Sequence, residues 1–458
     1  MRHQPLSGSL LLALLFASGC AAARTTACLT ARDCDAPLVC VAATCTRGPA
    51  PRDVGATQGD SDPGADAARP GSDAGPRPDA DGPPSDAGGS GLDAERTPLD
   101  GGAGVDAALA SDDGSAALTD AWLPPMDAGA VDPAVIQGFG SDTPGGSGMP
   151  PLHVTNLNAS GPGSLLEAVQ YDRRTIVFDV GGVIDAPDNV GVLGRAFITI
   201  DGFSAPAPGI TLTSGGLIIE GSHDIIVRGI RVRGAGDDGL RAFGSHHIVF
   251  DHCSSANNGG GNLDVTADSH DVTIQYCILG AAVAGSMLIA FDTQHVTVHH
   301  NLFHSQQDSG VGERSPLVHA APATSAVAYL MADIRNNVVW GWGRDRGTSY
   351  GYGTGLDYGA TANIINNFYE TNSGPLTDLA IELDHEASGS AAYTIGNVSG
   401  NGLDLSGVGN RATEFTAAPV ATEPACLAAS RVLASAGVRP LDAIDAALLG
   451  DVTLARCR

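Results

Sequence analysis

The chain has 458 residues, with 51 acidic against 24 basic side chains, so its formal net charge is −27. All the basic residues are arginines and they form no basic stripe, which argues against a nucleic-acid-binding protein. No stretch after the N-terminal region approaches 18 uninterrupted apolar residues, so no membrane-spanning helix is expected in the body of the chain.

Residues 1–19 have the pattern of a secretory signal. Arg2 precedes an apolar run at 10–16, and small residues at 17–19 stand before Cys20. The segment resembles a bacterial lipoprotein signal, which implies that Cys20 is lipidated and anchors the protein to a membrane. Ordinary secretion with cleavage nearby is the alternative. In both cases we expect a protein that is secreted or displayed on the outer membrane or cell surface.

Residues 20–45 form a short segment rich in cysteine. An even cluster of cysteines in an exported chain predicts a disulfide knot. Zinc is the weaker alternative, because the cluster holds no histidine and no Cys-x-x-Cys pair. If Cys20 is lipidated, eight cysteines remain, and Cys426 with Cys457 would form a C-terminal staple. The cysteines of the cluster are Cys28, Cys34, Cys40 and Cys45.

Residues 46–135 are dominated by Asp, Pro, Gly, Ala and Ser, with almost no aromatic or β-branched residues. Such a composition buries too little apolar surface to offset the entropy of ordering, so a disordered linker is predicted. The stretch holds 17 acidic residues and 5 arginines, a net charge of −12 (5 − 17). Much of the chain's negative charge therefore lies in the predicted linker, so the net charge of the chain does not indicate what kind of substrate it binds.

Four short β-branched runs repeat at intervals of 23, 24 and 24 residues. A constant period with one strand per repeat is typical of a solenoid, in which stacked units bury a continuous core. Leucine-rich repeats share the period but need a leucine frame, whereas these runs carry Val, Ile and Thr. We therefore predict an all-β parallel β-helix over residues 136–458. The runs are 224–227, 247–250, 271–274 and 295–298.

Aligning the repeats predicts one column of stacked residues on successive coils. Stacked asparagines pass amide hydrogen bonds from coil to coil, so this part of the column is expected to be structural. Cys253 and Cys277 would lie about 4.8 Å apart, which permits either a disulfide or two buried free thiols. The column consists of Ile230, Cys253, Cys277, Asn301, Asn337, Asn367 and Asn397.

Several motifs closely resemble pectate lyases of polysaccharide lyase family 1. The similarity begins at Gly138-Phe-Gly-Ser-Asp-Thr-Pro-Gly-Gly146 and extends to about Asp451. It includes Phe250-Asp-His-Cys-Ser254, Val298-His-His-Asn-Leu-Phe303 and Asn336-Asn-Val-Val-Trp340, in the family's order. The resemblance implies a right-handed parallel β-helix that cleaves pectate-like, acidic plant polysaccharide by β-elimination.

Such an elimination removes the C5 proton of a uronate, so a positive charge on the adjacent carboxylate helps to stabilise the carbanion. Ca²⁺ suits this task. The resemblance assigns calcium-ligand positions to Asp238 and Asp264. The third acidic position of the family falls on Gly260, so any calcium is expected to bind weakly and mainly with the substrate.

The resemblance also assigns the proton-abstracting arginine to Arg314, in Arg314-Ser-Pro316. The second arginine of that motif is Leu317 here, and a substrate-binding position falls on His319. The family's cleft lysine falls near Gly285-Ser286, and this chain contains no lysine.

Trp340 and Trp342 belong to an aromatic cluster that either stacks on sugar rings or packs over the later coils. The first alternative makes them substrate-binding residues.

Three functions are compatible with these features. The first is a calcium-assisted polysaccharide lyase, expected to be a monomer. The second is a polygalacturonase-type hydrolase that uses paired aspartates in Gly236-Asp-Asp-Gly239. The third is a degenerate β-helix that binds glycans without turnover, which Gly260, Leu317 and the missing lysine favour.

Overall fold

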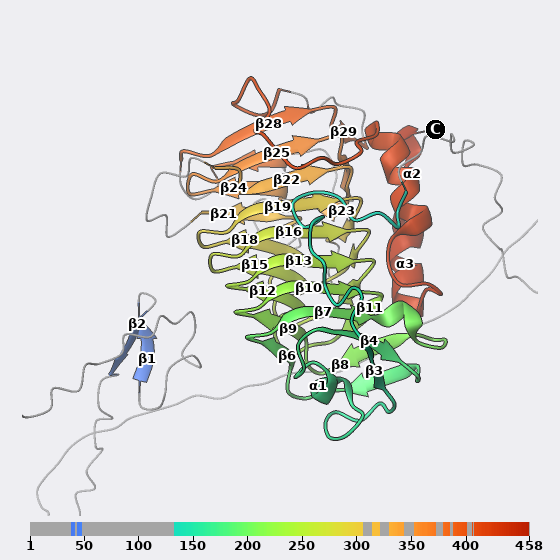
Figure 1. The fold of residues 1–458 in the computed structure, drawn as a ribbon. Helices are drawn as coiled ribbons and strands as arrows, with labels where there is room; N and C mark the ends of the chain where they lie inside the picture. The colour runs from blue at the N-terminus through green and yellow to red at the C-terminus, as the bar shows by residue number, and fades with distance from the viewer. Residues whose placement is uncertain are drawn as a thin grey trace, which may run out of the picture. The chain divides into compact units, whose positions relative to one another are not determined.

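A computed structural model gives the fold (Figure 1). It describes the backbone of 38–41 and 44–47, and residues 132–305, 314–320, 329–342, 352–371, 379–384, 388–400, 405 and 407–457. The chain divides into two units, residues 1–110 and 111–458. The predicted signal, Cys20, Cys28, Cys34 and almost all of the predicted linker lie outside the described residues.

In the first unit the structure describes a single hairpin. Strands β1 (Leu38–Val41) and β2 (Thr44–Arg47) pair in antiparallel register, with Cys40 opposite Cys45. The predicted disulfide knot stays a prediction.

The second unit confirms the predicted right-handed parallel β-helix. Successive strands enter three sheets in turn, and each strand pairs in parallel with its equivalents on the neighbouring coils. Sheet 1 contains β3 (Pro151–Val154), β4 (Arg174–Phe178), β7 (Ala196–Asp201), β10 (His223–Arg228), β13 (His246–Asp251), β16 (His270–Gln275), β19 (Gln294–His299), β22 (Ala332–Arg335), β25 (Thr361–Ile365) and β28 (Ala391–Ile395). Sheet 2 contains β5 (Gly182–Asp185), β8 (Ile210–Thr213), β11 (Ile230–Arg233), β14 (Ser254–Ala256), β17 (Ile278–Leu279), β20 (Leu302–His304), β23 (Val338–Trp342), β26 (Phe368–Thr371) and β29 (Val398–Ser399). Sheet 3 contains β6 (Val190–Leu193), β9 (Leu217–Glu220), β12 (Leu240–Phe243), β15 (Leu263–Thr266), β18 (Met287–Ala290), β21 (Leu317–His319), β24 (Tyr352–Asp357) and β27 (Leu379–Leu383).

The core fills the space between the three sheets. Strand residues alternate between the two faces, so every second side chain points inward. On sheet 3 the inward column includes Leu240, Leu263 and Met287, which are in register and fully buried. Each such side chain contributes about 1.5–3 kcal/mol through burial. The stacked apolar columns therefore hold neighbouring coils together.

The backbone conformation explains why a polar residue stands near the start of each repeat. Asp224, His247, Asp271 and His295 all adopt a left-handed conformation, with φ between 54° and 57°. Asp, Asn and His are enriched in this conformation among residues other than glycine. These residues therefore let each coil bend as it enters sheet 1.

The predicted asparagine column forms a continuous ladder. Each side-chain amide donates to the Oδ1 of the next asparagine, at 3.0 Å from Asn301 to Asn337, 2.9 Å from Asn337 to Asn367 and 3.0 Å from Asn367 to Asn397. Each Oδ1 also accepts the backbone N–H of the preceding member, and all four side chains are buried. The ladder thus satisfies polar groups inside the coil corner.

Replacing Asn337 by alanine should destabilise the fold by about 2–4 kcal/mol, because the Asn301 amide and the Val298 carbonyl, which Asn337 Nδ2 contacts at 2.9 Å, lose partners. Chemical denaturation monitored by circular dichroism measures this loss. The exposed Asn158→Ala is the matched control and should change stability by less than about 0.5 kcal/mol. An unchanged unfolding midpoint for the Asn337 variant would contradict the structural role.

Cys253 and Cys277 occupy the predicted column but do not form a disulfide. Both are free, buried thiols. Their sulfur atoms lie near backbone carbonyls, at 3.5 Å from Val227 for Cys253 and 3.4 Å from Gln275 for Cys277. The disulfide alternative is therefore wrong, and the two thiols act as small core residues.

Two helices cover the outer face of sheet 2 (Figure 1). α2 (Ala425–Ser435) and α3 (Ala443–Asp451) pack apolar side chains such as Val432 against that face, and Arg233 of β11 pairs with Asp445 of α3 at 2.8 Å. The predicted staple is confirmed, because Cys426 and Cys457 are joined by a disulfide. The other helices in the described residues are short: α1 (Leu165–Ala168), η2 (Gly202–Ser204) and η3 (Ala455–Cys457).

A segment without regular structure, residues 135–146, crosses the strands of sheet 1 before β3 (Figure 1). Its backbone N–H groups bond threonine hydroxyls on three coils: Phe139 to Thr297, Gly140 to Thr273 and Gly146 to Thr199. We call this segment the strap.

In the described part of the chain, no helix has the length and apolarity needed to cross a membrane.

Candidate active site

Two of the predicted site residues, Asp238 and Asp264, lie at the outer face of sheet 3 together with Arg241. Arg241 of β12 pairs in register with Asp264 of β15, and Asp264 pairs with Leu288 of β18. Along β12 and β15 the half-exposed residues alternate with buried ones, so Arg241 and Asp264 project outward on neighbouring coils. Asp238 lies in the turn before β12, three residues ahead of Arg241.

Both aspartates are held by backbone N–H groups. Asp238 Oδ1 accepts from Gly261 at 2.8 Å, and Asp264 Oδ1 accepts from Leu288 at 3.0 Å. These bonds link the carboxyls to the next coil, which fixes their positions.

Close packing explains why glycines occupy positions 260 and 261 of Gly259-Gly-Gly261. A Cβ on Gly260 would lie 2.5 Å from Asp238 Oδ1, and a Cβ on Gly261 would lie 2.5 Å from Asp264 Oδ1. Larger residues would push the carboxyls away. Gly260 thus contributes no ligand, but it makes room for Asp238.

The surroundings raise the pKa of both carboxyls. Dense packing and the charge of Asp238 raise the pKa of Asp264 to about 8, while Leu288 N–H, Arg314 and Arg241 oppose this shift. Burial likewise raises the pKa of Asp238, against the opposing effects of Gly261 N–H and Arg241. Two carboxyls that interact with two arginines in this way form one electrostatic unit, and such perturbed groups mark candidate functional sites.

The charge of Arg314 opposes the rise in the pKa of Asp264. The Arg314 carbonyl accepts the Met287 N–H at 2.8 Å, which joins it to β18. Its backbone is left-handed, with φ of 59°, a conformation that costs an arginine about 1–2 kcal/mol.

His319 lies on the same face but apart from the aspartates. It is two coils from Asp264 and two residues further along the strand. The usual spacings between and along strands therefore place it about 12 Å from Asp264. Its ring lies 4.7 Å from that of Tyr358, and its Nδ1 is 3.8 Å from Asp357 Oδ2. His319 therefore does not contact the two aspartates directly. Leu317, at the missing arginine position, is 7% exposed and in register with Leu288.

Trp340 and Trp342 do not belong to the site, so their predicted role in substrate binding is wrong. Both lie on β23 of sheet 2 and are only 8% and 2% exposed. Trp340 packs on His304 at 4.3 Å beneath the C-terminal helices, and Trp342 lies in the main core. Both tryptophans thus pack inside the protein.

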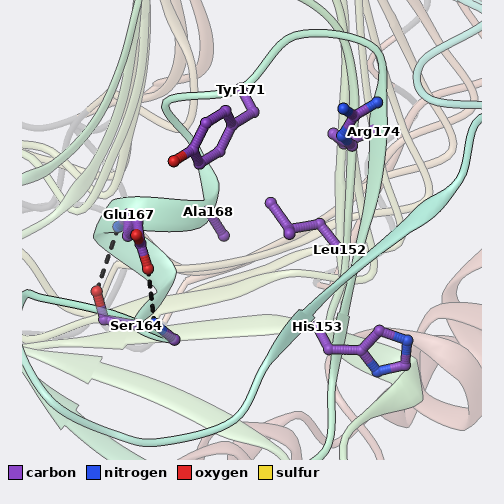
Figure 2. A pocket seen from close by; sticks show the side chains of 8 residues that line it. Leu152, His153, Ser164, Glu167, Ala168, Tyr171 and Arg174 are labelled. Carbon is purple, nitrogen blue, oxygen red and sulfur yellow. Dashed lines mark hydrogen bonds between the residues drawn. The ribbon is translucent and has the colours of Figure 1, made fainter.

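An open pocket lies elsewhere, around α1 at the N-terminal end of the β-helix (Figure 2). Glu167 is tied to the backbone N–H of Gly163 at 2.6 Å, and Ser164 accepts the Glu167 N–H at 3.2 Å (Figure 2). These contacts cap the helix. None of the candidate site residues lines this pocket.

Arg241 is the site residue that sequence reasoning missed. The available signal was its position three residues after Asp238, but its cross-strand partner Asp264 became evident only with the register. Its Nη1 lies 3.5 Å from Asp238 Oδ2.

The architecture defines a right-handed parallel β-helix, and residues 207–315 match the family model described as right handed beta helix region. The chain is similar to a probable pectate lyase C of Aspergillus fumigatus, with 32% identity over 271 residues that cover 58% of this chain and 57% of that protein. It is also similar to a probable pectate lyase C of Emericella nidulans, with 32% identity over 49% of this chain and 51% of that protein.

The crystal structure of jun a 1, the major allergen from cedar pollen, has the same fold. Its TM-score is 0.51 at 18% identity, over 66% of this chain and 92% of that one. The chain spans a little over half the length of the first curated relatives it matches.

Proposed function

We propose that this protein is a polysaccharide lyase that cleaves an acidic, pectate-like polymer by β-elimination. The observation that carries the proposal is the cluster of Asp238, Arg241, Asp264 and Arg314 on one face of sheet 3. Two guanidinium groups beside two carboxyls suit a uronate, whose carboxylate needs cationic partners. The similarity to the two probable pectate lyases supports the same reaction.

In this reaction Arg314 accepts the C5 proton of the uronate. The C5–H electron pair forms the C4=C5 double bond, the C4–O bond breaks, and the leaving oxygen takes a proton from water. Arg314 must be neutral when it accepts the proton, and the guanidinium cation that forms is balanced by the polymer's own carboxylate. The hydroxide left when water protonates the leaving oxygen then takes this proton, which returns Arg314 to its starting state. His319 lies at a distance suited to a neighbouring sugar unit.

Calcium assistance fits these residues only in part. A calcium ion takes six to eight oxygen ligands. Asp238 already accepts the Gly261 N–H and faces Arg241, Asp264 accepts the Leu288 N–H, and Gly260 offers no side chain. Within the described ranges, no three His, Cys, Asp or Glu side chains form a group that could hold a metal. The donor set therefore does not fit a resident calcium ion.

The proposed substrate implies an extracytoplasmic protein. The signal-like residues 1–19 are consistent with export, and lipidation of Cys20 would tether the β-helix to a membrane through the linker. A monomer with an acidic polysaccharide as its partner is the simplest form of this proposal.

Incubation with polygalacturonate should generate unsaturated ends that absorb in the near ultraviolet. New reducing ends without this absorbance would select a hydrolase instead. If neither product appears with several uronate polymers while the polymer still binds, the protein is a glycan-binding module and the proposed activity is wrong.

A further inference from the structure

Arg241 is an arginine without a strong partner. Its contacts in the described residues are the 3.5 Å approach to Asp238 and a position over the Phe243 ring, 5.5 Å from its centroid. Its Nε has no hydrogen-bond partner there. By contrast, Arg228 makes two bonds to Asp201, at 3.0 and 2.9 Å. Among the described residues, Arg241 thus retains donors for a further anion.

The position of Arg241 relates it to the proposed chemistry. It neighbours Asp264 across the β12–β15 pair, and Asp264 in turn interacts with Arg314. The side chain projects outward and is 27% exposed, so its end reaches solvent on the same face. A sugar unit beside Arg314 would therefore lie next to a second guanidinium.

A guanidinium is planar, permanently charged, and presents N–H groups that match a carboxylate in a two-bond arrangement. Removal of the C5 proton shifts negative charge onto the uronate carboxylate, so a fixed cation there stabilises the transition state more than the ground state. The reaction needs this charge, and the two aspartates do not fit a resident calcium ion.

We infer that Arg241 binds the carboxylate of the reacting uronate and supplies the positive charge for the elimination, so that turnover proceeds without a bound metal ion. This inference rests on the proposed lyase function. Asp238 has a matching role, because it holds the guanidinium from the turn before β12. The proton still passes to Arg314, and Arg241 neither gains nor loses one.

The test uses the full chain in excess EGTA, with polygalacturonate for turnover and trigalacturonate for equilibrium binding. The wild type should keep its elimination rate within about twofold of the rate in calcium. Arg241→Gln should lower kcat/KM in EGTA at least tenfold and weaken trigalacturonate binding, whereas Arg241→Lys should recover part of both because it keeps the charge.

Arg173→Gln is the matched control, because Arg173 also lies over a phenylalanine ring, that of Phe197 at 4.4 Å, but outside the site. It should match the wild type in every assay. Circular dichroism shows whether each variant folds.

The inference is overturned if the wild type is inactive in EGTA and calcium activates it and Arg241→Gln equally. It is also overturned if trigalacturonate binding in EGTA is unchanged by Arg241→Gln. If no polymer is cleaved under any condition, the proposed function fails, and the binding arm still decides whether Arg241 recognises a uronate carboxylate.

Discussion

Arg314→Ala should lower the rate of uronate elimination by about 10²–10⁴-fold, the usual contribution of a residue that transfers a proton in the transition state. The β-helix should persist, because the Met287 N–H bonds the backbone carbonyl of residue 314 and not its side chain. Initial rates of near-ultraviolet absorbance on polygalacturonate measure the loss, and circular dichroism verifies the fold.

Arg411→Ala is a suitable control for this variant, because Arg411 is exposed and stacks on Phe415 at 3.8 Å. It should retain the wild-type rate. A full rate in Arg314→Ala would place the base elsewhere, and the role that the resemblance assigns to Arg314 would be wrong.

Asp264→Asn should have opposite effects on stability and activity. The folded-state pKa of Asp264 is raised to about 8 from a usual value near 4, so folding favours the protonated form. The stability of this group is fully present below pH 4 and is lost as the pH rises through about 8. Asparagine keeps an oxygen for the Leu288 N–H without carrying charge.

The variant should therefore be more stable than the wild type by about 1–3 kcal/mol at pH 8, less than the full linkage value because Asp264 is partly exposed and coupled to Asp238. The difference should vanish near pH 4. Above about pH 8, where the wild-type carboxyl is charged, elimination should fall at least about tenfold, since asparagine removes that charge from the site. Urea unfolding at several pH values provides the measurement, and parallel pH profiles for both proteins would contradict the raised pKa of Asp264.

The coil period and the asparagine column were predictable because in-register stacking repeats directly in the sequence. Asn301, Asn337, Asn367 and Asn397 follow one another whatever the loop lengths between them. The state of Cys253 and Cys277 was not predictable, because spacing brings two rungs together but does not set the direction in which each thiol points.

The location of the tryptophans depended on distant parts of the chain. Trp340 lies beneath helices that come some ninety residues later, so the sequence around it contains no sign of its cover. A shift in strand register between Trp340 and Trp342 further breaks the simple alternation of faces. Arg241 was missed for a related reason, because its significance comes from cross-strand pairing with Asp264.

The strap has a consequence for how the β-helix unfolds. In a solenoid each repeat contacts only its neighbours, so an unbraced stack can fray coil by coil from its ends. The strap bonds Thr199, Thr273 and Thr297, which belong to β7, β16 and β19. Opening any one of these coils therefore breaks bonds that link it to the others, so the linked coils should unfold cooperatively. The middle of the stack carries Asp238 and Asp264. The strap thereby protects it from a partial opening that would separate these two carboxyls.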